Sequence, residues 1–371
     1  MLSIPRSTDV FVVGGGPAGL ATAIASRLKG LDVTVVDPAQ PPIDKACGEG
    51  LMPDSLTALE LLGISIGPDQ SYPFRGIRFV HESVSVGADF PIRRGLGIRR
   101  VTLHQTMLDR ARQLGVRMLW GQRVTGIGQG FASISGEETS CRWVVGADGL
   151  SSRVRCWAGL ESTHYESRRF GFRRHYRVAP WSDHMEIHWT DGYQIYLTPV
   201  SRDHVCVALI TRDPRQRLDD ALQAFPDLAG KLNGTAVTAE RGAITVSRRL
   251  HQVCRGSTVL VGDASGSVDA ITGEGLCLSF RQALALADAL ATGDLSSYES
   301  AHSRLFWRPA FMARLMLLLD QSSSLRRRAI RALSSKPEIF ANLVAMHVGE
   351  SSFADFLSGA MLPLSWRMLT A

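Results

Sequence analysis

The sequence predicts an α/β fold: a parallel sheet with helices, an inserted antiparallel sheet, and a helical C-terminal region. The first observation is a strand, a glycine-rich loop, a helix and a second strand within residues 9–37. The second is a hairpin pattern centred on Asp191-Gly192, in a segment of alternating apolar and polar residues. The third is the run of helix-like sequence from residue 298 onward.

The N-terminal segment has the pattern of a Rossmann-type dinucleotide-binding unit. An apolar run over 10–13 is followed by Gly14-Gly15-Gly16-Pro17-Ala18-Gly19, and an Ala/Leu/Ile-rich helix is expected up to Leu28. A second apolar run over 33–36 then ends in Asp37. Strand, G-x-G-x-x-G, helix, strand and acid, in this order, form a much more specific signal than the glycines alone.

The residues of this unit have separate expected roles toward a dinucleotide. Gly14 permits the tight turn, Gly16 lets a pyrophosphate approach the backbone, and Gly19 lets the helix pack close to the strand. The helix N-terminus offers unpaired N–H groups and a partial positive charge to phosphates. A carboxylate at the end of the second strand can accept hydrogen bonds from ribose hydroxyls, which favours FAD or NAD over NADP. The expected contacts here are Gly14, Gly16, Pro17, Ala18, Gly19 and Asp37.

Composition narrows the class of protein. The chain has 371 residues, 45% of them hydrophobic, which is enough for a sizeable core and two domains. The formal charge of +6 is scattered apart from the cluster Arg326–Arg328 and Arg331, and nucleic-acid motifs are absent, so no nucleic-acid partner is expected. The six cysteines form no C-x-x-C and no metal-spaced set. We therefore expect no metal and a reduced, cytoplasmic setting without a signal peptide or membrane span.

Between these landmarks the chain alternates strands and helices. The loop Asp44–Pro53 carries two glycines that flank an acid beside a cysteine, and a helix is expected to follow over 54–62. Strands are expected near 76–80 and 84–86, and then a helix capped by Thr102. The loop is open to two interpretations: a plain turn into the helix, or a functional loop.

The middle block, residues 165–248, is expected to form a half-buried antiparallel layer. Ile187 and Trp189 alternate with Glu186 and His188, which predicts one buried face and one exposed face. Such a sheet can form the far wall of a substrate pocket. Its polar candidates, each of which can equally be a surface residue, are Glu186, His188, Tyr193, Gln194 and Tyr196.

Two further strand-to-acid segments carry a family resemblance. Val145–Gly149 with Ser151–Arg155 resembles a D-G motif, and Val261–Ala264 with Thr272–Leu276 resembles a G-D motif. Together with the N-terminal fingerprint, they resemble the single-component flavoprotein aromatic hydroxylases (the p-hydroxybenzoate hydroxylase-like group) and their geranylgeranyl-reductase-like and halogenase-like relatives. The halogenases' W-x-W-x-I-P signature is absent.

The resemblance implies an organisation in three parts. Residues 1–73, 96–160 and 250–297 are expected to form a discontinuous FAD-binding domain. Residues 74–95 and 161–249 are expected to form the antiparallel substrate-binding domain, and 298–371 a C-terminal helical region.

The resemblance also implies roles for individual residues toward FAD. Arg100 would reach the phosphates, the backbone of Val124 would meet the adenine, and Asp263 would hold the ribityl or pyrophosphate portion. Residues 273–276 would begin a helix whose N–H groups face the flavin N1/O2 edge. The further expected FAD contacts are Lys45, Cys47, Gly48, Arg100, Val124, Asp148, Gly149, Gly262, Asp263, Gly273, Glu274, Gly275 and Leu276.

The loop Cys47-Gly48-Glu49-Gly50-Leu51 resembles the C-G-x-G-L loop of the geranylgeranyl-reductase-like branch, which lies near the isoalloxazine. Cys47 and Glu49 are therefore the catalytic candidates. Cys47 can be a redox or catalytic thiol, or only a small packing residue, and the sequence favours neither.

The implied activity is that of an FAD-dependent oxidoreductase. With one G-x-G-x-x-G in the chain, NAD(P)H is expected to bind transiently as reductant. The first expectation is a monooxygenase that hydroxylates a lipophilic or aromatic small molecule through a flavin C4a-hydroperoxide. The alternatives are a prenyl-chain alkene reductase of geranylgeranyl-reductase type, and a flavoprotein maturation factor that acts on a partner protein's side chain.

The C-terminal region also has two interpretations. The apolar stretch Phe311–Leu319 continues into the arginines at 326–328 and 331. It can be a helix packed on the FAD domain with a solvated basic end, or a lid over an apolar tunnel whose arginines contact anionic lipid. The second interpretation implies peripheral membrane contact and a lipophilic substrate. The oligomeric state stays open.

Overall fold

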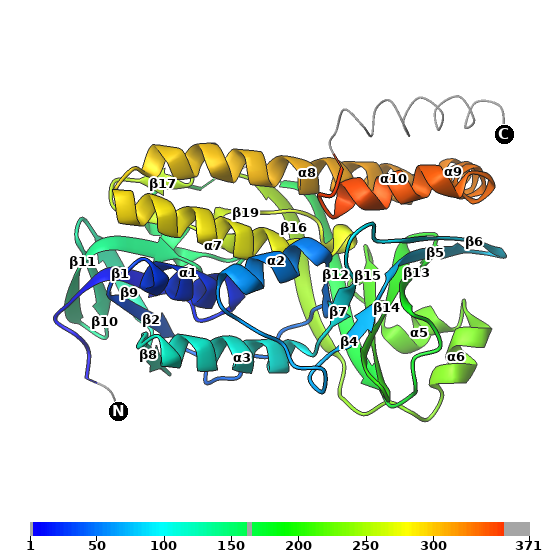
Figure 1. Cartoon of the computed structure of the whole chain (residues 1–371), viewed down its shortest axis with the longest axis horizontal. Coiled ribbons are helices and arrows are strands. Elements are labelled where there is room, and N and C mark those ends of the chain that lie inside the picture. Colours follow the sequence, from blue (N-terminus) through cyan, green and yellow to red (C-terminus); the bar gives the residue numbers. More distant parts are fainter. Residues whose placement is uncertain (1–2, 162–164, 352–371) are drawn as a thin grey trace.

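The computed structural model describes residues 3–161 and 165–351, which form two large sheets and a set of long helices (Figure 1). The first sheet lies at one end of the molecule and the second at the other. Two helices, α7 (Gly275–Thr292) and α8 (Leu295–Gln321), run along its length. The predicted α/β class with its Rossmann-type unit, inserted sheet and C-terminal helices is confirmed.

The first sheet has a parallel centre, with strand order β17-β18-β11-β1-β2-β8. Val12 in its central strand pairs with Val35 on one side and Val145 on the other. The apolar runs predicted as strands are buried here because helices α1 (Pro17–Leu28), α3 (Arg100–Gln113) and α7 pack against the sheet. The strands are β1 (Ser7–Val13), β2 (Val33–Asp37), β8 (Arg117–Trp120), β9 (Val124–Gly128), β10 (Phe131–Ile134), β11 (Glu137–Gly146), β17 (Cys254–Arg255) and β18 (Thr258–Leu260).

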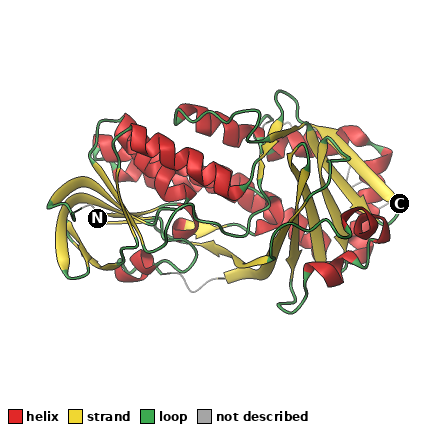
Figure 2. Ribbon diagram, turned by 90° about the horizontal axis from the view of Figure 1, so that it is seen from below, coloured by secondary structure: helices red, strands yellow, loops and turns green. Residues whose placement is uncertain are grey.

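The second sheet is antiparallel except for one parallel pair, β13 with β5. Figure 2 shows this sheet on the right, with its strands running nearly vertically. The predicted hairpin is confirmed: Thr190 pairs with Tyr193 across Asp191-Gly192, and Gly192 has φ +87°. The strands are β5 (Gly76–His81), β6 (Val84–Asp89), β12 (Tyr165–Tyr176), β13 (His184–Thr190), β14 (Tyr193–Ser201), β15 (His204–Thr211), β16 (Arg241–Arg249) and β19 (Gly266–Ser267).

The expectation of an exposed polar face on β13 is wrong. Glu186 is only 6% exposed, although its position in the alternation predicts exposure. Its carboxylate accepts hydrogen bonds from Arg78 and from the indole N–H of Trp181, at 3.3 Å each. Burial of a carboxylate is tolerable when such partners replace water, so the polar side of this strand is covered as well.

Helices cover both faces of the second sheet. On one side, an apolar cluster that includes Phe79 and Phe340 joins the sheet to α8 and the two helices after it. On the other side, Leu209 and Leu222 belong to a separate cluster under two short helices. The covering helices are α5 (Leu218–Leu222), α6 (Pro226–Leu232), α9 (Ser323–Ser335) and α10 (Pro337–His347). The part of the predicted helical region from 352 to 371 lies outside the described residues.

The start of α3 differs from the prediction. The helix begins at Arg100 rather than after a Thr102 cap. Its first backbone N–H donates to Glu49 Oε1 at 2.9 Å, so the cap comes from a loop 51 residues away. A local sequence pattern cannot reveal a cap supplied from such a distance.

Short elements complete the connections between the two sheets. A small sheet in the order β3-β7-β4 lies next to the loop that carries Glu49. The short elements are β3 (Gly50–Leu51), β4 (Tyr72–Phe74), β7 (Gly95–Gly97), α2 (Pro53–Leu61), α4 (Arg153–Trp157), and the 3₁₀ turns η1 (Gly262–Ser265) and η2 (Ala270–Thr272).

The division into domains remains a proposal. We propose the boundaries given above because β5 and β6 pair with strands of 161–249, and because β17 and β18 extend the first sheet. Of the helices within residues 3–161 and 165–351, none combines the length and the apolarity needed to cross a bilayer.

Candidate active site

A cavity of about 540 Å³ lies between the glycine-rich loop of the first sheet and the inner face of the second. It brings together segments that are far apart in the sequence: the loop after β1, the loop before β3, the start of α3, both strand-to-acid motifs and the start of α7. The predicted site residues that line it are Gly14, Gly16, Pro17, Ala18, Asp37, Lys45, Cys47, Gly48, Glu49, Arg100, Asp148, Gly149, Asp263, Gly273, Gly275 and Leu276.

The three glycines of the fingerprint have the geometry that a dinucleotide requires. A Cβ on Gly14 would lie 2.4 Å from the carbonyl oxygen of Ala147, and φ at Gly14 is +109°. A Cβ on Gly19 would lie 1.8 Å from the carbonyl oxygen of Gly14. At Gly16, by contrast, a Cβ would meet nothing within 4 Å, because this residue faces the cavity. Only Gly16 therefore leaves room that a pyrophosphate can use.

Asp37 and Arg100 provide opposite charges along the cavity. Asp37 accepts the N–H of Gly15 at 2.7 Å and that of Ala39 at 2.8 Å, which holds its carboxylate beside the glycine loop. Arg100 is 4% exposed, and its Nη1 has no hydrogen-bond partner among the described residues. Burial lowers the pKa of Arg100 from its ordinary value. A buried, unpartnered guanidinium nitrogen at a cavity wall is suited to an anion such as a phosphate.

The two acids of the later motifs hold different positions. Asp148 accepts the N–H groups of Arg153 and Val154 at 2.7 and 3.2 Å, so it caps α4 as well as lining the cavity. Asp263 lies 3.6 Å from Lys45 Nζ, and both side chains are about half exposed at the cavity wall. The residues present thus fit an FAD. The fingerprint loop and Arg100 would hold its pyrophosphate, and the flavin ring would supply the hydride chemistry.

Four of the predicted FAD contacts do not line the cavity. Gly19 faces the backbone of Gly14, and Val124 is buried at 5% exposure in β9. Gly262 donates its N–H to Gln282 Oε1 at 2.9 Å. The side chain of Glu274 turns away from the cavity into the contact between helices α7, α8 and α10.

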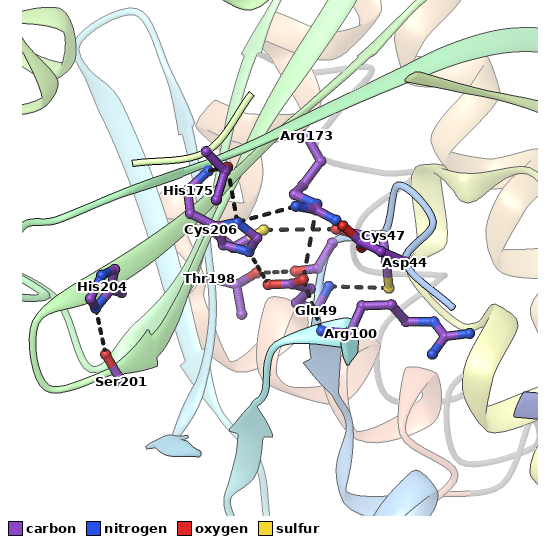
Figure 3. A network of polar contacts seen from close by, with 12 residues as sticks. Asp44, Cys47, Glu49, Arg100, Arg173, His175, Thr198, Ser201, His204 and Cys206 are labelled. Atoms are coloured by element: carbon purple, nitrogen blue, oxygen red, sulfur yellow. Dashed lines mark hydrogen bonds and ion pairs between the residues drawn. The ribbon is translucent and has the colours of Figure 1, made fainter. Parts of the chain in front are cut away.

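The loop with Cys47 and Glu49 is fixed by a buried polar network (Figure 3). Glu49 is 2% exposed and has φ +60°, a rare conformation for a non-glycine residue. Its Oε2 lies 2.7 Å from His175 Nε2 on β12, and its Oε1 accepts the N–H of Arg100. The network continues through Arg173, which contacts His175 and also pairs with Asp44.

The direction of each hydrogen bond in this network can be assigned. Arg173 Nη1 lies 3.1 Å from His175 Nδ1, and a guanidinium can only donate, so Nδ1 is the acceptor. The imidazole proton is then on Nε2, where it is donated to Glu49. Cys206 donates to the carbonyl oxygen of Cys47 at 3.7 Å.

Glu49, His175 and Cys206 also place one potential metal-ligand atom each within 4.8 Å of one another. However, the hydrogen bonds already account for all three atoms. We therefore assign these residues to positioning of the loop. Glu49 acts through Arg100 and the loop backbone and carries no free carboxylate oxygen toward the cavity.

Cys47 has a different environment from Glu49. Cys47 lines the cavity, and its sulfur accepts the N–H of Glu49 at 3.3 Å. Burial raises the pKa of Cys47, so the group is a thiol at neutral pH rather than a reactive thiolate. Among the described residues, no acceptor for its S–H proton lies within hydrogen-bond distance. The proton can therefore be offered to a molecule in the cavity.

Of the five polar candidates in the middle block, Tyr196 lines the cavity and the others do not. Tyr193 donates to the carbonyl oxygen of Ala221, and Gln194 donates to Asp320. Glu186 and His188 contact each other at 3.2 Å away from the cavity.

Sequence reasoning missed several residues of the site. They are Asp44, Arg173, His175, Thr198 and Cys206, which form the network around the loop. One signal was available: Arg169, Arg173 and His175 recur at even spacing within the block expected to form a sheet, and even spacing in a strand places them on one face. Three cationic or titratable residues on a face that also carries Gly171 indicate a buried polar network.

The part of the cavity away from the glycine loop is lined mainly by apolar residues, and the polar residues Arg173, Thr245, Ser267 and Asp269 also line the cavity. Tyr196 donates its O–H to the carbonyl oxygen of Ile271 at 2.7 Å, and Thr198 donates to the carbonyl oxygen of Gly48 at 2.7 Å. These hydroxyl protons are therefore already used. The apolar lining residues of this part are Met52, Phe172, Met185, Ala208, Ile210, Ala243, Ile244, Val246, Val268 and Ala270.

Fold and site together define an FAD-dependent oxidoreductase, and the comparison with known families agrees. The FAD binding domain family matches residues 7–293, so the chain belongs to that family. The predicted resemblance to aromatic hydroxylase-like and geranylgeranyl-reductase-like flavoproteins is confirmed at this level.

The chain is similar in sequence to two named reductases and in fold to a solved flavoprotein structure. Menaquinone reductase of Mycobacterium tuberculosis is 26% identical over 348 residues, covering 86% of this chain and 85% of its own. Digeranylgeranylglycerophospholipid reductase 1 of Methanopyrus kandleri is 28% identical over 292 residues, covering 72% and 76%. A flavoprotein/dehydrogenase structure from Cytophaga hutchinsonii superposes with a TM-score of 0.84 at 15% identity, covering 98% of both chains. The last comparison concerns the fold alone.

Proposed function

We propose that this flavoprotein reduces a double bond in a lipophilic molecule, such as a prenyl chain or a quinone, with NAD(P)H as the transient source of hydride. The observation that carries the proposal is the apolar part of the cavity, in which the two hydroxyl groups of Tyr196 and Thr198 are already hydrogen-bonded to backbone. A polar substrate bound there would leave its own hydrogen-bonding groups unsatisfied, whereas an apolar one loses nothing.

Three further points support reduction rather than hydroxylation. The loop Cys47-Gly48-Glu49-Gly50-Leu51 is similar to that of geranylgeranyl-reductase-like proteins. Of the proteins named above, the two with 26% and 28% sequence identity are named as reductases. Reduction of an alkene needs one hydride and one proton, and the thiol of Cys47 is a proton-bearing group in the cavity wall.

In this proposal the chain's residues perform separable tasks. The fingerprint loop and Arg100 bind the cofactor, and the network of Glu49, His175 and Arg173 orients the loop. The apolar lining excludes water from the reacting region. Cys47 holds a proton at its sulfur, beside the space that a substrate can occupy.

A monooxygenase acting on a lipophilic aromatic molecule is the second candidate. The same apolar lining favours it, since such an enzyme also needs a dry cavity for its substrate. It shares the cofactor and the reductant with the first candidate, and it differs in the need for O₂ and in the product.

A substitution at the cavity opening tests the substrate class. Ile244 lines the cavity and is 44% exposed, so an aspartate there can stay solvated without unfolding the protein. We expect Ile244→Asp to slow reoxidation of the reduced flavin by a long-chain prenylated quinone at least about tenfold, because one charge at an apolar contact costs more than about 1.4 kcal/mol. The rate at which NAD(P)H reduces the flavin should change less in this variant.

The matched control is Val237→Asp. Val237 is 40% exposed and does not line the cavity, so this variant should behave like wild type with both partners. If Ile244→Asp and Val237→Asp oxidise equally fast with the long-chain quinone, the apolar cavity does not bind the substrate. Faster turnover of a short, charged quinone than of the prenylated one by wild type would contradict the lipophilic class.

The C-terminal helices bear on how a lipophilic substrate is reached. Leu318 of α8 is 54% exposed, and Arg327, Arg328 and Arg331 lie on exposed positions of α9. We propose that these side chains make peripheral contact with anionic lipid. Cosedimentation with anionic but not zwitterionic vesicles, lost in Arg327→Glu/Arg328→Glu, is the expected result. Equal sedimentation of the variant would argue against this contact.

A further inference from the structure

Glu274 occupies an unusual position at the amino-terminal end of α7. It is the residue between Gly273 and Gly275, both of which line the cavity, yet its own side chain is 3% exposed and points into the protein. There it meets helices from three other parts of the chain, represented by Asp54 of α2, Arg308 of α8 and His347 of α10. The C-terminal helices thus contact the residue that lies between two glycines of the cavity wall.

The carboxyl group of Glu274 lacks the partners that a buried carboxylate normally has. Neither of its oxygens has a hydrogen bond among the described residues. Oε1 lies 3.6 Å from Arg308 Nη2, and Oε2 lies 3.4 Å from His347 Nδ1. The same Nη2 of Arg308 lies 2.5 Å from Asp54, so the guanidinium charge mainly stabilises the Asp54 carboxylate.

The surroundings determine which groups carry charge. Burial raises the pKa of Glu274 to about 8, and burial lowers the pKa of His347 to about 4. At neutral pH a protonated carboxyl therefore faces a neutral imidazole. The other charged or titratable groups that act on Glu274 are Asp54, which raises its pKa, and Arg308 and Arg281, which lower it; Cys277 of α7 lies in the same cluster.

The neighbouring backbone gives this protonation state a consequence for the cofactor. The free N–H groups at the start of a helix favour negative charge, and Gly273 and Gly275 present that helix start to the cavity. A flavin gains negative charge on reduction when it takes two electrons and one proton. An ionised Glu274 at the same helix end would oppose that charge, whereas a protonated one would not.

We propose that Glu274 couples the reduction potential of the bound FAD to pH by holding a proton next to the cofactor. The number of protons taken up on reduction differs between the two protonation states of Glu274. With Glu274 protonated, reduction adds two electrons and one proton, delivered together as hydride. With Glu274 ionised in the oxidised protein, reduction adds the same hydride and one further proton, taken from water by the carboxylate. The proposal rests on FAD binding and is independent of the substrate.

The test is the midpoint potential of the holoenzyme from pH 6 to 10, compared with that of Glu274→Gln. The amide keeps the size of the side chain and cannot ionise. The difference between the two potentials should stay constant below pH 7. Above about pH 8 the wild-type equilibrium constant should fall by a further factor of ten per pH unit, which is about 30 mV for a two-electron couple. Parallel curves over the whole range would overturn the proposal.

Two more variants make the result specific. Asp54→Asn removes the acid that opposes ionisation of Glu274 and frees Arg308 for it, so the extra slope should begin at a lower pH. An onset that does not move would contradict the assigned cluster. Glu60→Gln is the matched control: Glu60 lies on the same helix α2 but is exposed and paired with Arg93, so its curve should follow wild type. If Glu274→Gln fails to bind FAD, the pH at which the extra slope begins in Asp54→Asn still tests the proposal.

Discussion

Glu49→Gln is the sharpest test of how the loop beside the cavity is held. The change keeps the shape of the side chain and removes its charge. Glu49 Oε2 lies 2.7 Å from His175 Nε2, Oε1 accepts the N–H of Arg100 at 2.9 Å, and Arg173 Nε lies 3.9 Å from Oε1. The amide can still accept from Arg100 through its oxygen. Its NH₂ group then faces the N–H of His175.

The histidine cannot relieve this conflict by changing tautomer. With its proton on Nδ1, the ring would face the donor group of Arg173, which lies 3.1 Å away. One donor therefore faces another in either tautomer. Losing a charge-assisted hydrogen bond costs about 1.5 to 3 kcal/mol, and we expect the free energy of unfolding to fall by that amount. Asp44 still pairs with Arg173, so the full cost of an uncompensated buried charge, about 3 to 5 kcal/mol, is not expected.

The assay is urea unfolding at a fixed excess of FAD, because ligand concentration changes apparent stability. Glu60→Gln is again the matched control, since the exposed ion pair that it removes contributes only about 0.2 to 1 kcal/mol to the free energy of unfolding. A double-mutant cycle with His175→Gln should give a coupling energy between the two sites. If Glu49→Gln unfolds within about 0.5 kcal/mol of wild type, below the cost of a charge-assisted hydrogen bond, the buried pair does not hold the loop.

Four other predictions follow from single contacts. Gly16→Val should abolish FAD binding but leave the apoprotein folded, whereas Gly19→Val should unfold it, because only the second Cβ meets backbone; flavin content and circular dichroism separate the two. Cys47→Ala should keep full flavin content and lose about 10²-fold or more in substrate reduction, and an unchanged rate would return Cys47 to a packing role. Glu49→Gly should be more stable to urea than Glu49→Ala by about 1 kcal/mol, because φ +60° is costly for alanine; the reverse order would show that the loop relaxes. Burial lowers the pKa of His302 to about 4, so between about pH 6.5 and pH 4 the unfolded chain binds a proton that the folded chain does not. The free energy of unfolding should therefore fall as the pH drops through this range. His302→Asn should reduce that slope by up to one proton, about 1.4 kcal/mol per pH unit, in unfolding measured across the same range.

Much of the fold could be predicted because its signals are local. The glycines at 14, 16 and 19 and the acid at 37 carry their geometric reasons within one βαβ unit. The hairpin at Asp191-Gly192 is another local signal, since a two-residue turn requires such residues. These features need no knowledge of distant contacts.

The parts that sequence could not supply depend on long-range contacts. The N-terminus of α3 is capped by Glu49, and Glu49 itself is paired with His175, 126 residues away. The exposed face predicted for β13 is buried because Arg78 and Trp181 come from other elements. The turn of Glu274 away from the cavity depends on helices α8 and α10, whose positions no local motif encodes.

The most direct test of the proposed function is a single turnover of NADPH-reduced holoenzyme with a prenylated quinone or polyprenyl lipid in the strict absence of O₂. We expect the flavin to be reoxidised at a rate that depends on the lipid, and we expect mass spectrometry to find a product with two added hydrogen atoms. A flavin that stays reduced until O₂ is admitted, with a product that then contains one added oxygen atom, would contradict reduction and establish the monooxygenase.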